Sequence, residues 1–418
     1  MTFQNQIIRR SVFQGGLVVF LLGLVIAGAV AVGGASGPEK YLYIWAGDQA
    51  RIASDFVAVV NFDESSRDYG KVITTVSLPN PGNTGNEPHH VGLSNDGKVL
   101  ACGGLLSVLK GQREIFFFDV SKPGEPKFIA AADPPQSAIT DEFYALPNGG
   151  FLVTMMGGAQ GHHPGRVAEF DKSLKLVAEY PAEPPDDGFN PHGISVQPEA
   201  NLMVTSDFIC PSTTLHAVPG DLVLRGSVRV WDFNARKILR KIDLPNAGGT
   251  IDVRLIPGDK NLRGYTAGMS DDRLYLLDTK QGTAKAVFDF SSIAKGGWPQ
   301  LMRMAKDGKR LFISMNMAGK VVMFDTSDPE APRVVKVIDL GKDSGPHYIA
   351  LTRDEKRLVI TDYFLNEDDA GKVHAEGDHK VHVAKVTKND LVLDGKFNLD
   401  MNTAIASGPA RPHGVAFK

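Results

Sequence analysis

Cysteine is almost absent from this 418-residue sequence. The two cysteines, Cys102 and Cys210, lie far apart in the chain, and the sequence does not tell whether they pair. A small scaffold held together by several disulfides is therefore excluded.

An excess of charge of one sign is also lacking. The formal net charge is only −3, which gives no electrostatic basis for a nucleic-acid partner. The sequence contains no Walker loop, no dinucleotide-binding glycine fingerprint, no G-x-S-x-G elbow and no H-E-x-x-H motif. These common catalytic classes are therefore not indicated.

The N-terminus carries the one long apolar run. Residues 15–37 are nearly uncharged and follow Arg9 and Arg10. A basic flank, an apolar segment and a small-residue end are typical of an export signal, and Ala35 fits a cleavage site. The run is also long enough to span a bilayer as a helix. We expect residues 1–37 to form an apolar signal or anchor helix. The rest would be periplasmic, either soluble after cleavage or anchored to the inner membrane by this segment alone.

Helical patterns are nearly absent after Gly37, where short strands alternate with turns. Residues 88–104 combine a proline, two histidines and two short apolar runs around an Asn-Asp-Gly turn. Similar first strands recur along the chain, each followed by further strands, and the last ends the sequence at 412–418. Three strands before residue 88 would complete that last unit. We predict an all-β fold, a seven-bladed β-propeller over residues 38–418 closed by strands from both termini.

Histidine is scarce but concentrated at one position of the repeat. Aligning the seven first strands gives one equivalent position per unit: His89, Asp141, His192, Ile251, Gln300, His347 and His413. His90 and Glu142 follow one residue later. Since the innermost strands of a propeller line its central channel, these side chains are expected to meet there.

Imidazole is the commonest metal ligand among side chains and suits copper, zinc, iron and nickel. We therefore predict a metal site in the channel, with these histidines as its ligands: His89, His90, His192, His347 and His413. Asp141 and Glu142 could orient the ligands, bind the metal directly or act as a general base. The alternative is that each histidine only bonds backbone where its strand begins.

Several segments resemble the selenium-binding protein and methanethiol oxidase family. They include EPHHVG (87–92), IFFFDVSKPGEPKF (115–128), FDTSDPEAPRVVKVIDL (324–340) and DEKRLVITDYF (354–364). The resemblance implies a seven-bladed propeller and copper-dependent oxidation of methanethiol by O2 to formaldehyde, hydrogen sulfide and hydrogen peroxide. The family's paired histidines fall on His89 and His90, its C-terminal histidine on His413, and the glutamate of its second blade on Glu142.

The chain also departs from the family pattern. The family's cysteine pair after the double histidine is absent, since only Cys102 is present there, and its histidine before Glu142 is missing from residues 137–140. His192 and His347 stand where better-known members have other residue types.

We therefore hypothesise an exported, metal-dependent oxidase of a small thiol or related sulfur compound. It would use O2 and copper, with Glu142, Asp141 and His90 as catalytic residues. Two alternatives stay open: a non-catalytic metal-binding or interaction propeller, and an iron oxygenase with four histidine ligands. The sequence does not give the metal, the substrate or the oligomeric state.

Overall fold

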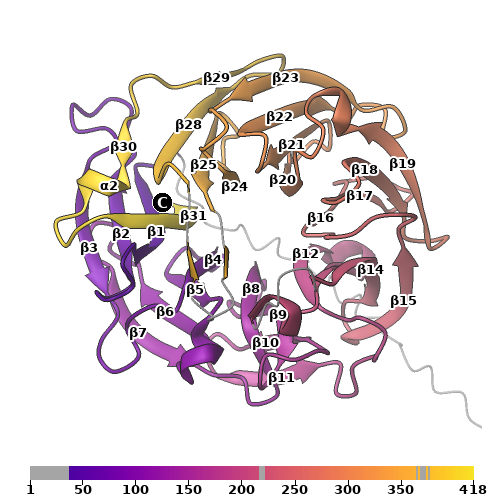
Figure 1. Ribbon diagram of the computed structural model, residues 1–418, viewed down its shortest axis with the longest axis horizontal. Coiled ribbons are helices and arrows are strands. Elements are labelled where there is room, and N and C mark those ends of the chain that lie inside the picture. The colour runs from indigo at the N-terminus through magenta and orange to yellow at the C-terminus, as the bar shows by residue number, and fades with distance from the viewer. Residues whose placement is uncertain (1–36, 216–221, 364–365, 368–372, 375–376) are drawn as a thin grey trace, which may run out of the picture. The chain divides into compact units, whose positions relative to one another are not determined.

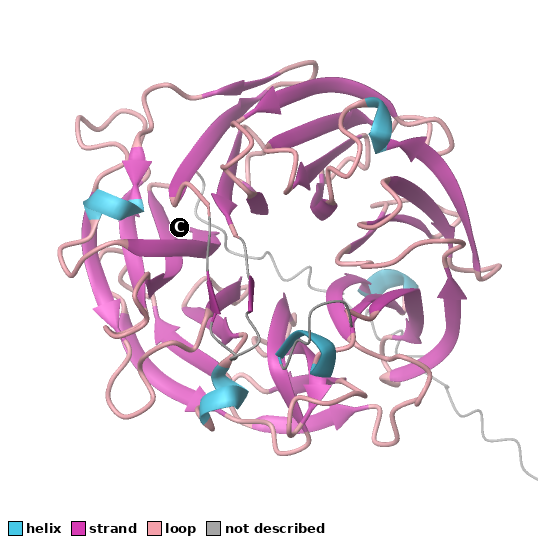
Figure 2. Cartoon of the chain, viewed as in Figure 1, coloured by secondary structure: helices cyan, strands magenta, loops and turns pink. Residues whose placement is uncertain are grey.

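Strands account for nearly all regular structure in the part of the chain that the structure describes. This computed structural model describes residues 37–215, 222–363, 366–367, 373–374 and 377–418. Four-stranded sheets are arranged around a common centre (Figure 1), and the helices within these ranges are single short turns (Figure 2). The predicted all-β, seven-bladed propeller is confirmed.

The predicted N-terminal helix over residues 1–37 lies almost wholly outside the described residues. Among the residues described, none of the helices is long and apolar enough to cross a membrane. Cys102 and Cys210 are both buried as free thiols.

The first three blades run from their inner strand outward in chain order. Blade 1 consists of β4 (Pro88–Leu93), β5 (Val99–Gly104), β6 (Ile115–Asp119) and β7 (Lys127–Ala132). Blade 2 consists of β8 (Ser137–Ala145), β9 (Phe151–Gly158), β10 (Arg166–Phe170) and β11 (Leu176–Tyr180). Blade 3 consists of β12 (Pro191–Gln197), β13 (Leu202–Ile209), β14 (Leu224–Asp232) and β15 (Lys237–Asp243).

The next three blades repeat this order. Blade 4 consists of β16 (Val253–Leu255), β17 (Arg263–Gly268), β18 (Arg273–Asp278) and β19 (Thr283–Asp289). Blade 5 consists of β20 (Pro299–Met304), β21 (Arg310–Met315), β22 (Lys320–Asp325) and β23 (Arg333–Asp339). Blade 6 consists of β24 (Pro346–Leu351), β25 (Arg357–Asp362), β28 (Lys380–Val386) and β29 (Leu391–Leu393), with β30 (Leu399–Asp400) also on β28.

Short elements lie in the connections. The pair β26 (Asn366–Glu367) and β27 (Val373–His374) falls in the insertion of blade 6. The helical turns are α1 (Ser212–Leu215), α2 (Met401–Ala404), η1 (Ser107–Lys110), η2 (Pro198–Ala200) and η3 (Phe290–Ser292).

Both ends of the propeller meet in blade 7. Its outer strands β3 (Val72–Ser77), β2 (Phe56–Asn61) and β1 (Tyr41–Asp48) come from the N-terminal side, and the inner strand β31 (Ala410–Phe417) pairs antiparallel with β1. The prediction that three N-terminal strands complete the last blade is therefore confirmed. This pairing joins strands from both ends of the described chain in one sheet and so closes the ring.

Hydrophobic side chains pack between neighbouring blades. Trp45 of β1 is fully buried against Phe116 and Phe118 of β6, with ring centroids 5.8 and 6.1 Å away. Its indole N–H donates to the Gly103 carbonyl at 2.8 Å. Because the faces of a single blade are covered only by its neighbours, the core is a ring of such interfaces, and the inner strands are held rigidly around the channel.

Candidate metal centre

A register shift recurs where six of the seven inner strands face the channel. In β4 the partner of Pro88 is Gly104, whereas the partner of Val91 is Cys102, so the inner strand accommodates one extra residue. Corresponding shifts occur in the inner strands of blades 2, 3, 5, 6 and 7. A β-bulge of this kind bends a strand and re-aims its side chains. Each of these blades therefore has two consecutive channel positions.

The register shifts give the same alignment as the sequence did. The first channel position holds His89, Asp141, His192, Gln300, His347 and His413. The second holds His90, Glu142, Gly193, Leu301, Tyr348 and Gly414. In blade 4 the corresponding residues, Ile251 and Asp252, precede the three-residue strand β16.

Glycine follows histidine in blades 3 and 7 because neighbouring backbone leaves no room for a side chain. A Cβ on Gly414 would lie 2.5 Å from the carbonyl oxygen of His89, and a Cβ on Gly193 would lie 2.8 Å from the Cα of Asp252. The close approach of adjacent inner strands brings the channel histidines together. The Pro-His-Gly sequence thus has a packing reason in addition to any chemistry of its histidine.

Five buried histidines meet at the centre of the ring. The rings of His89 and His90 are stacked, with centroids 4.3 Å apart. The ring of His413 lies 4.2 Å from that of His89 and 4.9 Å from that of His347. The His192 ring lies 5.3 Å from that of His90.

Their ligand atoms form two overlapping groups in which all members lie within 4.8 Å of one another. One group contains His89, His90, His347 and His413, and the other contains His89, His90, Asp141 and His192. We call these six residues the channel cluster. The structure thus brings together all five histidines that the sequence proposed as ligands, together with Asp141.

The hydrogen bonds of His347 and His413 leave their Nε2 atoms free to bind a metal. The Nδ1 atom of His347 lies 2.5 Å from Gln300 Oε1, and that of His413 lies 3.1 Å from the Pro88 carbonyl oxygen. Both oxygens are acceptors, so a neutral ring carries its proton on Nδ1 and a lone pair on Nε2. Metal-binding histidines are commonly oriented through such a bond.

Several buried polar atoms of the channel cluster have no hydrogen-bond partner among the described residues. They are both ring nitrogens of His89 and of His90, Nδ1 of His192, Nε2 of His347 and of His413, and both carboxylate oxygens of Asp141. Buried polar atoms are nearly always paired in folded proteins. A cation at the centre of the cluster would bind one lone-pair nitrogen of a neutral imidazole or a carboxylate oxygen, and these residues therefore fit a metal ion.

The channel histidines are uncharged at neutral pH. Burial lowers the pKa of His89, His90, His192 and His413 well below the ordinary value, and neighbouring imidazoles lower it further. Burial, followed by the charge of Arg303, lowers the pKa of His347 to about 3. Neutral imidazole is the form that binds metals.

Asp141 is the carboxylate closest to the histidines. It is fully buried, and its Oδ1 atom lies 3.1 Å from both His90 Nδ1 and His192 Nε2, and 3.7 Å from His89 Nε2. Burial, with the neighbouring carboxylates of Glu142 and Asp252, raises the pKa of Asp141 well above the usual range. Its position suits a metal ligand or a proton acceptor for these imidazoles.

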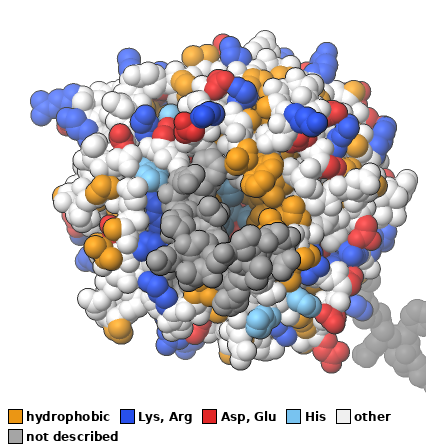
Figure 3. All heavy atoms as spheres, viewed as in Figure 1, with side chains coloured by type: hydrophobic (Ala, Val, Ile, Leu, Met, Phe, Trp, Pro, Cys, Tyr) orange, Lys and Arg blue, Asp and Glu red, His pale blue; other side chains and the backbone are white. Residues whose placement is uncertain are grey.

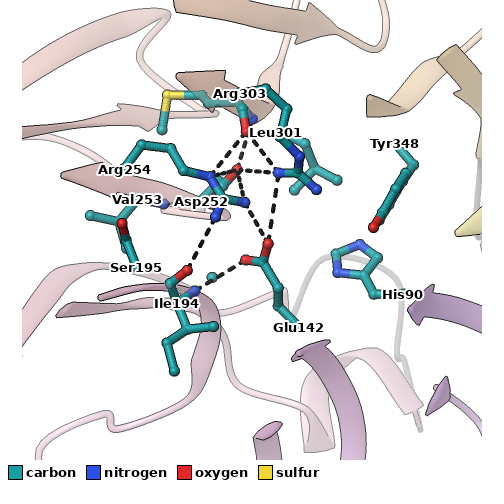
Figure 4. Close-up of polar contacts among 12 residues, drawn as sticks. His90, Glu142, Ile194, Ser195, Asp252, Val253, Arg254, Leu301, Arg303 and Tyr348 are labelled. Atoms are coloured by element: carbon teal, nitrogen blue, oxygen red, sulfur yellow. Dashed lines mark hydrogen bonds and ion pairs between the residues drawn. The ribbon is translucent and has the colours of Figure 1, made fainter. Parts of the chain in front are cut away.

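Glu142 is instead part of a buried ion-pair network (Figure 4). Its Oε1 atom lies 2.5 Å from Arg254 Nη2 and 3.7 Å from Arg303 Nη1, while its Oε2 atom accepts a hydrogen bond from the Ile194 N–H at 3.1 Å. Arg254 also binds Asp252, at 3.0 Å. These guanidinium contacts neutralise the carboxylate that the sequence proposed as a catalytic base.

A mostly apolar cavity of about 220 Å³ lies against one side of the channel cluster. Of the cluster, His89, His192 and His347 line it, whereas His90, His413 and Asp141 do not. Its described walls include the apolar side chains of Leu105, Ile139, Met156, Phe208, Ile209 and Met269. Hydrophobic side chains also gather beside the central hollow on the face drawn in Figure 3. A molecule in this cavity would contact the cluster from the side of these three histidines.

Tyr363 was missed by the sequence analysis. It directly follows β25 and lines the cavity, with its ring 4.2 Å from that of His413 and 5.3 Å from that of His89. Its buried hydroxyl has no hydrogen-bond partner among the described residues. Its place directly after the Ile-Thr-Asp end of a second strand could have indicated a residue at the channel mouth.

Arg254 and Arg303 were also missed. Each lies two residues after the second channel position, in the adjacent blades 4 and 5. Since side chains two residues apart in a strand lie on the same face, this spacing could have placed both arginines near Glu142.

Comparisons with known proteins agree with this architecture. A hypothetical selenium-binding protein from Sulfolobus tokodaii has the same fold, with a TM-score of 0.77 at 18% sequence identity over 92% of this chain and 94% of that one. A methanethiol oxidase from Hyphomicrobium sp is 26% identical over 391 residues, covering 88% of this chain and 84% of that protein. The human methanethiol oxidase is 23% identical, covering 87% of this chain and 89% of that protein.

The family model described as 56kDa selenium binding protein matches residues 28–418. This match spans the whole propeller, including every residue of the channel cluster. The resemblance predicted from the sequence motifs is confirmed, and the chain belongs to the selenium-binding protein family.

Proposed function

We propose that this protein is a metal-dependent oxidase that uses O2 to oxidise a small thiol. The observation that carries the proposal is the channel cluster, in which six buried residues converge and several nitrogen and oxygen atoms have no hydrogen-bond partner among the described residues. The oxidase activity is supported by relatives named methanethiol oxidase. The adjoining cavity supports a small-molecule substrate.

Copper is the metal we propose, with iron as the alternative. Imidazole ligands suit both metals, and unlike zinc both can change oxidation state. When bound, the metal would favour the thiolate form of the substrate and transfer its electrons to oxygen. We propose that the ion is held by the all-histidine group of the channel cluster, His89, His90, His347 and His413, whose ligand atoms lie within 4.8 Å of one another. His192 belongs to the overlapping group with Asp141.

The proposed reaction is the oxidation of methanethiol with water and O2 to formaldehyde, hydrogen sulfide and hydrogen peroxide. The carbon is oxidised by two electrons, which reduce O2 to the peroxide, and water supplies the aldehyde oxygen. Asp141 is the proposed proton acceptor, because its Oδ1 atom is 3.1 Å from both His90 and His192. Glu142 is paired with Arg254, so its negative charge would instead balance the charge of that guanidinium beside His90.

We further propose that the protein is exported to the periplasm. Arg9 and Arg10 followed by the nearly uncharged residues 15–37 support this location. An epitope-tagged full-length protein should be found in the periplasmic or inner-membrane fraction of a bacterial host, and recovery in the cytosol would contradict the proposal.

Elemental analysis tests the metal centre directly. Protein expressed with copper should contain stoichiometric copper and should consume O2 when methanethiol is added. His347→Ala should lose most of the metal, because the substitution removes one ligand and the remaining ligands no longer complete the coordination of the ion. His382→Ala is the matched control, since His382 lies in β28 and contacts Asp378 rather than the channel cluster.

The possible results separate the alternatives. Stoichiometric iron would favour the four-histidine oxygenase, and metal without O2 consumption would favour a metal-binding carrier. Protein without a transition metal after expression with either copper or iron would refute the proposed function.

A further inference from the structure

The cavity beside the channel cluster is larger and more apolar than methanethiol requires. It has a volume of about 220 Å³, whereas an apolar cavity of about 150 Å³ suffices to bind benzene. We propose that it is a substrate chamber for an uncharged thiol with an apolar chain of several carbons. This inference rests on the proposed function and adds the substrate class to it.

The position of the cavity orients such a substrate. His89, His192 and His347 form the end next to the cluster, so the sulfur atom would lie there. Leu105 and Met156 lie along the wall and are almost fully buried. The apolar chain would extend from the cluster along this wall.

The outer end of the cavity is formed by more accessible residues. Leu222 is 49% exposed and Trp298 is 37% exposed, although both line the cavity. Trp298 has a φ of +53°, in the left-handed region that costs a non-glycine residue free energy. Trp298 therefore presents a large apolar side chain to an apolar ligand at this end of the cavity.

The polar side chains in the wall are mostly engaged elsewhere. Gln300 Oε1 is bonded to His347, and the Asn316 amide donates to the carbonyls of Gly345 and Tyr363. No lysine, arginine, aspartate or glutamate is among the described residues that line the cavity. A charged thiol would therefore lose hydration without gaining an ion pair from the described part of the wall, which is unfavourable. The Tyr363 hydroxyl is the uncharged hydrogen-bonding group left to meet the reacting end.

The chemistry follows from the proposed reaction. A primary alkanethiol would give the corresponding aldehyde, hydrogen sulfide and hydrogen peroxide from O2 and water, with the same electron balance as methanethiol. Benzenethiol has no hydrogen on the carbon that bears sulfur, so it can bind but cannot be converted in this way. It therefore serves as a probe of binding alone.

Steady-state O2 consumption by the metal-loaded protein tests the chamber. The series methanethiol, 1-propanethiol and 1-pentanethiol should show KM falling by about fourfold for each methylene buried, which corresponds to ~0.8 kcal/mol. Benzenethiol should inhibit competitively, whereas 2-mercaptoethanesulfonate should be neither a substrate nor an inhibitor. An equal or higher KM for 1-pentanethiol than for methanethiol would overturn the proposal, as would efficient oxidation of the sulfonate.

Two variants test whether the dependence of KM on the length of the thiol arises in the cavity. Met156→Phe fills part of the wall and should raise the KM for 1-pentanethiol at least tenfold while changing that for methanethiol less than threefold. Met304→Phe is the matched control, because Met304 packs in the interface of blades 4 and 5 and does not line the cavity. Equal effects of both variants would contradict the assignment.

A binding measurement separates failure of the chamber from failure of the proposed function. Calorimetric titration with benzenethiol should show binding to the wild type and at least tenfold weaker binding to Met156→Phe, whether or not any thiol is oxidised. Binding without O2 consumption would refute the oxidase and support the chamber. O2 consumption with methanethiol but no binding of benzenethiol would refute the chamber and support the oxidase.

Discussion

At the scale of single residues, Tyr363 combines contact with the channel cluster and a place in the cavity wall. Its hydroxyl is buried without a partner among the described residues, and its ring packs 4.2 Å from that of His413. Burial raises the pKa of Tyr363 well above its usual range, so the hydroxyl retains its proton. It can therefore donate a hydrogen bond to a negatively charged sulfur or oxygen atom at the reacting end of the cavity.

Tyr363→Phe should lower kcat about ten- to hundredfold, because a hydrogen bond to a charged group contributes roughly 1.5–3 kcal/mol. The metal content and the KM for an apolar thiol should change little, since the aromatic ring and the cavity wall remain. Steady-state kinetics with elemental analysis checks both. An unchanged kcat, or a loss of metal equal to the loss of activity, would show that the hydroxyl has no catalytic role.

Residues differ in how far the sequence predicts them. Four of the five histidines could be aligned because the repeat carries each of them to the same place, and His90 directly follows the first of them. Tyr363 could not, since it belongs to a connection after β25 and contacts His413 only through the closed ring. The pairing of Glu142 with Arg254 joins residues 112 positions apart, so the spacing within the repeat places the arginine near the channel but does not specify its partner.

At the scale of elements, hydroxyl groups connect the inner strands of neighbouring blades. Thr154 Oγ1 bonds to the His192 carbonyl at 2.5 Å, Ser314 Oγ to the His347 carbonyl at 2.8 Å, and Thr361 Oγ1 to the His413 carbonyl at 2.7 Å. Each hydroxyl is on the second strand of one blade and its acceptor is in the next. These bonds fix the backbone at three of the channel histidines.

Ser314→Ala should destabilise the protein by about 1–3 kcal/mol and weaken metal binding. The change leaves the His347 carbonyl and the Leu301 N–H without the hydroxyl that they share, and both are buried. Chemical denaturation and metal titration measure the two effects. Ser314→Thr is the matched control, because threonine occupies the equivalent positions 154 and 361, and it should retain most of both properties. Equal losses in Ala and Thr would mean that packing, not the hydroxyl, is responsible.

The strands could be predicted from the sequence, whereas the irregularities in their pairing could not. Alternating residues and turns predict the strands and their order, but the bulge at the channel positions depends on which neighbour a strand meets. In blade 4 the side chain of Asp252 accepts hydrogen bonds from the backbone N–H groups of Val253 and Met302, both at 2.7 Å. The inner strand there is only three residues long.

At the scale of the whole molecule, long-range contacts close the ring. Arg357 of blade 6 donates to the Phe62 and Glu39 carbonyls at 2.7 and 2.8 Å and stacks on the Phe62 ring. Arg411 of blade 7 pairs with the buried carboxylate of Glu87, before blade 1, at 2.5 and 2.9 Å. These contacts hold the terminal strands on either side of the joint in blade 7.

Metal binding should strengthen the same closure. The all-histidine group comes from blades 1, 6 and 7, so an ion bound there links strands on both sides of the joint in blade 7. The site does not exist in the unfolded chain, and binding therefore adds to the free energy of unfolding, by about 2.7 kcal/mol at a free metal concentration of 100 Kd. The melting temperature should rise with metal and fall again when a chelator is added.

His413→Ala should abolish this shift, because it removes a ligand from the strand that closes the ring while leaving β31 paired with β1. His382→Ala should retain the shift, since that residue lies outside the channel cluster. Differential scanning calorimetry with and without copper compares the three proteins. If the shift persisted in His413→Ala, the stabilising ion would be bound elsewhere, and the link between the metal and ring closure would be refuted.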